Sequence, residues 1–214
     1  KEPSLYEQAC MLAERILPIK PWKELEQKYQ ASIEFTHMRI TPRSAFSLTI
    51  IATIFTFIVP LFIFLVLGTL SLSVLMLIIV FTLLVFYFLY DYPTHYATVF
   101  RIKASAEMVL AIVYMTISIQ VTPNLENAIR FAARNLTGPL ADDLRRLLWD
   151  VYMRKYDTIA EALDSFIRKW KVENREFTEA IYLIKTSMGE STKRREEVLN
   201  EAISVMLNGT KERM

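Results

Sequence analysis

The feature that most limits the fold of this chain is a stretch without any Asp, Glu, Lys, Arg or His, from residue 44 to residue 90. Polar residues interrupt it clearly at one place, residues 68–73. A bilayer core of roughly 30 Å needs about 20 apolar residues in a helix, so the stretch is too long for one span. In lipid each backbone N–H must be bonded within its own segment, which favours helices. The sequence therefore predicts a transmembrane helical hairpin with spans at about 44–67 and 72–90.

Basic residues flank this stretch on both sides, whereas the expected turn carries none. They are Lys23, Lys28, Arg39 and Arg43 before it, and Arg101 and Lys103 after it. The positive-inside rule places both flanks in the cytoplasm and the turn outside. We therefore predict a multi-pass protein of the cell membrane with both termini in the cytoplasm.

A second apolar segment, residues 108–119, leaves room for an alternative topology with a third span. It is only about a dozen residues long, which is typical of a buried core helix. If it crossed the membrane, the Arg- and Lys-rich sequence after it would lie outside, against the charge rule. We interpret the segment as a core helix and keep the third span as the alternative.

The sequence from residue 94 to 214 shows apolar residues at helical spacing and no strand alternation. Six helices are expected there, among them one opened by Thr122-Pro123, one after Gly138-Pro139 and one opened by a capping box from Thr158 to Glu161. The expected core contains Leu144, Leu148, Leu163, Phe166 and Ile181. The predicted fold class is all-α, a transmembrane helical hairpin followed by a six-helix cytoplasmic bundle.

Three regions follow from this reading: an N-terminal cytoplasmic helical arm at 1–40, the hairpin at 44–90 and the bundle at 94–214. The arm offers too little core to stand alone, so we expect it to pack on the larger domain or to lie at the membrane surface. The chain starts with Lys1 and ends in charged helical sequence, which leaves open whether it is a fragment of a longer protein.

Composition argues against several function classes. The net charge is only +2, with acidic and basic residues interspersed, so no nucleic-acid partner is expected. One cysteine, Cys10, excludes an intrachain disulfide and a cysteine-cluster metal site, and four glycines leave no Gly-rich phosphate loop.

Candidate catalytic residues are few. His37 and His95 lie near the two ends of the hairpin, without a third ligand or base in the neighbouring sequence. Asp142-Asp143 could bind a cation, but a carboxylate pair in the first turn of a helix is more simply explained by the helix dipole. We expect no enzyme activity, no metal and no cofactor.

Several short motifs occur in an order that resembles a known family. They are Asp91-Tyr92-Pro93, Tyr114-Met115, Thr122-Pro123-Asn124-Leu125, Gly138-Pro139-Leu140-Ala141, the segment from Asp157 to Leu163, and Met188-Gly189-Glu190. The arrangement resembles the F domain of type II secretion systems and type IV pili, and most closely the archaeal membrane platform proteins of pili and the archaellum. Tyr156-Asp157 departs from the family pattern, which usually has glycine there.

The resemblance implies a function without catalysis. Such a platform is gripped from the cytoplasm by a hexameric secretion ATPase and helps to move pilin-like subunits from the lipid bilayer into a filament. Family members have two such halves, so this chain would correspond to the first half or to a shortened relative, and a homodimer is left open. A membrane-anchored helical scaffold or receptor domain with no secretion role is the alternative. The filament type and the face that contacts the ATPase stay undetermined.

Clusters of basic residues are the candidate ATPase-docking surface. They are Arg145, Arg146, Arg154, Lys155, Lys193, Arg194 and Arg195. One interpretation is a solvated face balanced by nearby acidic residues. The other is an electrostatic dock for an acidic ATPase surface, where charges at the rim set association rate and orientation more than affinity.

Overall fold

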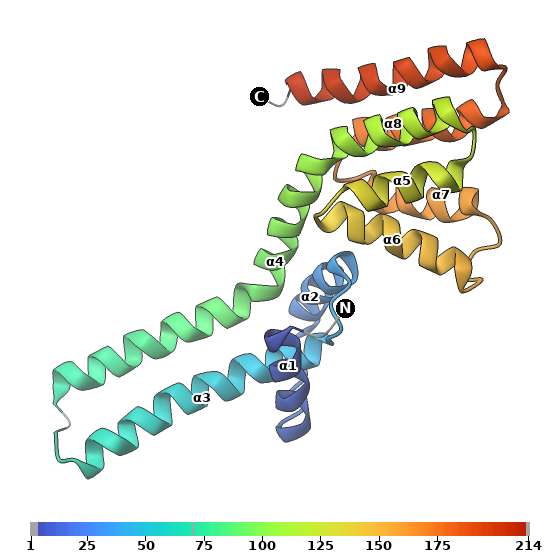
Figure 1. Ribbon diagram of the computed structural model, residues 1–214. Coiled ribbons are helices and arrows are strands. Elements are labelled where there is room, and N and C mark those ends of the chain that lie inside the picture. The colour runs from blue at the N-terminus through green and yellow to red at the C-terminus, as the bar shows by residue number, and fades with distance from the viewer. Residues whose placement is uncertain (1–3, 70, 213–214) are drawn as a thin grey trace. The chain divides into compact units, whose positions relative to one another are not determined.

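The computed structural model describes residues 4–69 and 71–212 (Figure 1). All regular elements in this part of the chain are helical, which confirms the predicted all-α class. The chain divides into two compact units, Lys1–Val99 and Phe100–Met214. The division falls inside one helix, α4 (Leu72–Val121), so α4 contributes to both units.

Among the described residues two helices are long enough and apolar enough to cross a membrane, α3 (Pro42–Val66) and α4. Their most apolar stretches have mean hydropathies of 2.7 and 2.9, and only 6% and 11% of those stretches is buried. Thr41 opens α3 with a capping box, in which its hydroxyl accepts the Ser44 N–H at 3.1 Å and the Ser44 hydroxyl accepts the Thr41 N–H at 2.9 Å. Between the two helices Gly68 adopts a φ of +67°, a left-handed conformation that glycine reaches without a steric penalty.

Helix α4 runs without a break where the sequence analysis expected two helices. We predicted a span ending near residue 90 and a new helix from about residue 94, whereas the structure has one helix of 50 residues with Pro93 inside it. A proline in a helix interior removes a hydrogen bond and costs about 3 kcal/mol. Local packing offsets this cost, because Pro93 is buried and the ring of Tyr92 lies 4.0 Å from that of Tyr6.

The N-terminal arm forms α1 (Leu5–Ile16) and α2 (Lys23–Thr36). Both pack against the beginning of α3. Their small core is centred on Cys10, Leu25 and Tyr29 and includes Phe46 of α3. The Tyr29 hydroxyl also donates a hydrogen bond to the backbone carbonyl of Tyr90 in α4. The arm is therefore held at the base of the two apolar helices.

The second unit contains the end of α4 and five further α-helices. These are α5 (Leu125–Asn135), α6 (Pro139–Tyr152), α7 (Ile159–Trp170), α8 (Arg175–Thr186) and α9 (Thr192–Glu212), with a 3-10 turn, Ser187–Gly189, before α9. Leu144, Leu148, Leu163, Phe166 and Ile181 are all buried, as predicted.

The ambiguous segment 108–119 belongs to the core of this unit. Met108, Ile112, Met115 and Ile119 are each at most 1% exposed. The ring of Tyr114 also contacts that of Phe131 in α5, with centroids 5.9 Å apart. The segment thus packs as a core helix and not as a third apolar span.

Two predicted helix starts differ in detail. Asn124, not Thr122, caps α5, because its side chain accepts a backbone N–H three residues on, at 3.0 Å. At α7 the Thr158 hydroxyl accepts the Glu161 N–H at 3.2 Å, as a capping box requires. The Glu161 carboxylate, however, accepts the N–H of Asp157 instead of that of Thr158, at 3.1 Å. The second half of the box is therefore shifted by one residue.

Candidate functional site

Helix α6 presents the first pair of predicted docking residues. Its apolar residues Leu140, Leu144, Leu147 and Leu148 are buried. Arg145 and Arg146 lie between them in sequence and are exposed. The 3.6-residue period of the helix therefore turns both guanidinium groups towards solvent.

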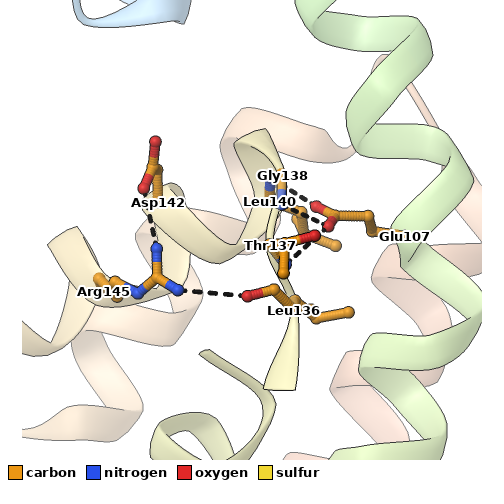
Figure 2. A network of polar contacts seen from close by, with 7 residues as sticks. All are labelled: Glu107, Leu136, Thr137, Gly138, Leu140, Asp142 and Arg145. Carbon is orange, nitrogen blue, oxygen red and sulfur yellow. Dashed lines mark hydrogen bonds and ion pairs between the residues drawn. The ribbon is translucent and has the colours of Figure 1, made fainter. Parts of the chain in front are cut away.

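Arg145 is part of a local network at the start of α6 (Figure 2). It forms an ion pair with Asp142, with Nη1 and Oδ1 3.0 Å apart, and donates a hydrogen bond to the Leu136 carbonyl at 3.2 Å. Leu136 is the C-terminal cap of α5, where carbonyls lack helical partners. Arg145 thus stabilises the α5–α6 connection in addition to carrying a surface charge.

Glu107 of α4 completes this network from the other side. Its carboxylate accepts backbone N–H groups of Thr137, Gly138 and Leu140 at 3.1, 2.6 and 3.2 Å (Figure 2). These donors stand at the N-terminus of α6, where N–H groups are unpaired and the helix dipole favours an anion. A Cβ atom on Gly138 would lie 2.8 Å from the Glu107 carboxylate carbon, so glycine gives the carboxylate room. This role of Glu107 was not predicted, and its only sign in the sequence is a lone acid directly before the apolar segment 108–119.

The end of α6 holds Arg154 and Lys155. Arg154 has a φ of +56°, a left-handed conformation that ends the helix. The Lys155 ammonium lies 2.8 Å from Oδ2 of Asp150, and this hydrogen bond raises the pKa of Lys155. The charge of Lys155 is consequently neutralised by Asp150 of α6, whereas the neighbouring Arg154 is an exposed cation.

The second cluster, Lys193, Arg194 and Arg195, lies in the first turns of α9. Cations are unfavourable at a helix N-terminus. Arg194 forms an ion pair with Glu197 at 2.8 Å, and Arg195 donates to the carbonyls of Ser187 and Glu190 at 3.3 and 2.9 Å. These local contacts compensate for the position of both guanidinium groups.

The two clusters do not form one surface. Helices α6 and α9 lie on opposite sides of the second unit, with α7 and α8 between them (Figure 1). Arg145, Lys155, Arg194 and Arg195 are engaged locally. Arg146, Arg154 and Lys193 are exposed and form no ion pair within residues 4–69 and 71–212. These three are the cations most available to a partner.

The Asp142-Asp143 pair is divided between two contacts. Asp142 binds Arg145, whereas Asp143 is 3% exposed and lies 2.6 Å from the Lys169 ammonium of α7. Burial lowers the pKa of Lys169, and the Asp143 carboxylate opposes that shift. Within the described residues no three His, Cys, Asp or Glu side chains are grouped so as to hold a metal ion.

The two histidines belong to the first unit. His37 ends α2 in a left-handed conformation, with a φ of +55°, and His95 is an exposed residue of α4. The structure therefore places His37 at a helix end and His95 on the surface of a helix.

Comparisons with protein-family models, with curated proteins and with solved structures gave no significant match to this chain.

Proposed function

We propose that this protein is an integral membrane platform of a machine related to type II secretion systems, type IV pili or archaella, which couples a cytoplasmic secretion ATPase to the assembly of pilin-like subunits. The observation that carries the proposal is helix α4. Its first part is apolar and exposed, and its last part lies in the core of the second unit. Force applied to that unit would therefore reach the apolar segment along one helix, without an intervening loop. A device that transmits motion to a bilayer needs such a connection.

The exposed apolar residues support insertion of α3 and α4 as a hairpin. Phe55, Phe62 and Leu65 of α3 are each more than 60% exposed, as are Leu77 and Phe88 of α4. Apolar area in contact with water is unfavourable in proportion to its size. Surrounding these helices with acyl chains removes that cost. With cytoplasmic basic flanks, Gly68 and Ser71, in the connection between the two helices, then lie outside the cell.

Cysteine labelling from outside intact cells tests this topology. Ser71→Cys should react with a membrane-impermeant maleimide, and Ser191→Cys, exposed before α9, should not. The native Cys10 is a poor reporter of sidedness, because burial raises its pKa to about 11 and the thiolate is the reactive form. Labelling at residue 191 from outside would contradict the topology.

Binding to the cognate ATPase tests the partner. Arg145 and Lys155 have local roles, so the sharpest charge reversal is the pair Arg146→Glu and Arg154→Asp, since Asp tolerates a left-handed backbone better than most residues. The reversal should slow association at low salt and lose its effect at high salt, because exposed charges are screened over about 8–10 Å at physiological ionic strength. The measurement is of the association and dissociation rates of the ATPase with the full parent and variant chains in nanodiscs, at low and at high salt.

A matched control for this experiment carries Arg168→Glu and Lys171→Glu, which change the net charge equally at exposed positions of the same unit. An unchanged association rate for the Arg146/Arg154 variant at low salt would show that the ATPase does not bind at α6. Lys193 and Arg194 would then be tested next.

The local engagement of Arg145, Lys155, Arg194 and Arg195 favours a second candidate, a membrane-anchored helical scaffold. In that case the charges serve the fold and no ATPase binds. Failure of the unsubstituted chain to bind the ATPase encoded beside it would favour the scaffold.

A further inference from the structure

Helix α1 carries its leucine and isoleucine side chains on an exposed stripe. Leu5, Leu12 and Ile16, spaced seven and four residues apart, share one face of the helix. They are 85%, 59% and 73% exposed. The residues that α1 buries fully are small, Cys10 and Ala13, and the ring of Tyr6 is half-buried against the same core. The helix is therefore attached to its neighbours by a face other than its most apolar one.

The acidic residues of α1 point in the opposite direction. Glu7 and Glu14 lie about half a helical turn away from the stripe. The Glu7 carboxylate accepts the backbone N–H of Arg39 at 2.8 Å, and the Glu14 carboxylate accepts the Thr41 hydroxyl at 3.2 Å. A surface helix in water normally buries its apolar side chains and exposes its acidic ones. Helix α1 does the reverse, because its glutamates contact the protein while its leucines and isoleucine are exposed. A neighbouring apolar medium on the stripe side would explain it.

Contacts of the arm place α1 beside the two ends of the stretch without charged residues, near residues 47 and 90. The ring of Tyr6 in α1 lies tilted beside that of Tyr92 in α4, with ring centroids 4.0 Å apart. The N–H of Ile19, just after α1, donates to the hydroxyl of Ser47 in α3 at 3.0 Å. Trp22 contacts the ring of Tyr90 at 6.2 Å. Tyrosine and tryptophan concentrate at the membrane–water interface, so this is the level of an interfacial belt.

An apolar groove continues from α1 onto α3. It measures about 340 Å³ and is lined by Ile16 and Leu17 on one side and by Ile54, Phe55 and Ile58 on the other, with Ile51 and Val59. The α3 side of the groove belongs to the segment proposed to lie in lipid. The stripe of α1 and the lipid-facing side of α3 are thus continuous, and exposed basic residues, Arg15 and Arg43, flank them.

We propose that α1 lies flat on the cytoplasmic surface of the membrane, with Leu5, Leu12 and Ile16 inserted among lipid acyl chains and the groove beside α3 filled by an acyl chain. This inference rests on the proposed membrane hairpin. Lipid is the occupant because the groove opens onto the apolar flank of α3 and the nearby exposed charges match anionic headgroups. The arm then lies in the membrane–water interface and holds the first turns of α3 in place.

Spin-label accessibility measures the position of α1. The full chain, reconstituted in vesicles of phosphatidylcholine and phosphatidylglycerol, carries a nitroxide at Leu12→Cys or Ile16→Cys. Phe62→Cys on α3 is the reference for hydrocarbon, and Glu24→Cys on the exposed side of α2 is the reference for water. The parent chain treated with the same label gives the background from buried Cys10.

Labels at residues 12 and 16 should show a ratio of oxygen to water-soluble nickel accessibility several-fold above that at residue 24. A ratio equal to that at residue 24, with residue 62 in hydrocarbon, would overturn the inference and leave the hairpin intact. Shielding of residues 12 and 16 from both relaxants would indicate a protein partner or a second copy, and would also overturn it. Water accessibility at residue 62 would remove the hairpin and the inference together.

Discussion

The two units place the same kinds of apolar residue in opposite positions. In the second unit Leu163 and Ile181 are fully buried, whereas Phe62 of α3 and Leu77 of α4 are 64% and 68% exposed. At the beginning of α3 the polar Ser47 is completely buried. The second unit buries its apolar residues in a core, whereas the apolar helices leave theirs exposed, which is unfavourable in water.

The difference teaches that the pattern of charges, more than the content of apolar residues, indicates the surroundings of a helix. Helices α5–α8 alternate apolar and charged residues at helical spacing and bury the apolar side. Helix α3 has no charged residue after Arg43, so no face of its later turns is marked for water.

Truncating one buried and one exposed side chain gives the largest expected contrast. Leu163→Ala should destabilise the second unit by about 2–5 kcal/mol, because it removes buried contacts and leaves a cavity. Phe62→Ala should leave the melting of that unit unchanged, since Phe62 belongs to the first unit and its side chain is largely exposed. With the exposed Trp22 and Trp149 replaced by Phe in all chains, fluorescence of buried Trp170, followed in detergent micelles during heating, measures both variants. Equal melting curves for Leu163→Ala and the parent would contradict the assigned core.

The buried ion pair sharpens the comparison, because it is a polar contact within the unit that buries its apolar residues. Lys169→Met removes the ammonium that the Asp143 carboxylate contacts at 2.6 Å. Leaving a buried carboxylate without its counter-charge costs about 3 kcal/mol, at the lower end for buried pairs since Lys169 is 21% exposed. The same Trp170 melting experiment should show this loss.

The double variant Asp143→Leu with Lys169→Met is the control for the ion pair. It should recover most of the lost stability, because replacing both partners by apolar residues removes the desolvation penalty. If the double variant is less stable than Lys169→Met alone, Asp143 has a role beyond this ion pair.

The smallest expected effect is a pH dependence of the α1 contact. Burial alone would raise the pKa of Glu7, but hydrogen bonds from the Arg39 and Ser4 N–H groups bring it below the ordinary value of 4.5. The folded pKa is therefore lower than the unfolded one. The stabilisation is present above 4.5 and is lost as pH falls through the lowered pKa.

A spin label at Leu5→Cys should accordingly become more mobile as the pH falls below 4.5. Glu7→Gln should abolish this dependence and show the more mobile spectrum throughout. A pH response that persists in Glu7→Gln would assign the effect to another group.

Some features of the site were readable from sequence and others were not. Exposure of Arg145 and Arg146 followed from the spacing of the leucines around them. The contact of Arg145 with the Leu136 carbonyl did not, since Leu136 precedes the Gly138-Pro139 break and its position depends on how α5 meets α6. Likewise, no sequence pattern separates Asp142 from Asp143, and only packing against α7 buries the second of them.

The sequence by itself determined the all-α class, the two long apolar segments and the core positions of α6–α8, because period and charge are local properties of a helix. The tertiary structure alone decided that α4 continues through Pro93, that Glu107 caps α6 and that α1 turns its acids inward. Each of these depends on atoms distant in the chain, such as the ring of Tyr6 near Tyr92 or the Arg39 N–H near Glu7. Long-range contacts of this kind carry no periodic signature, so only the folded chain reveals them.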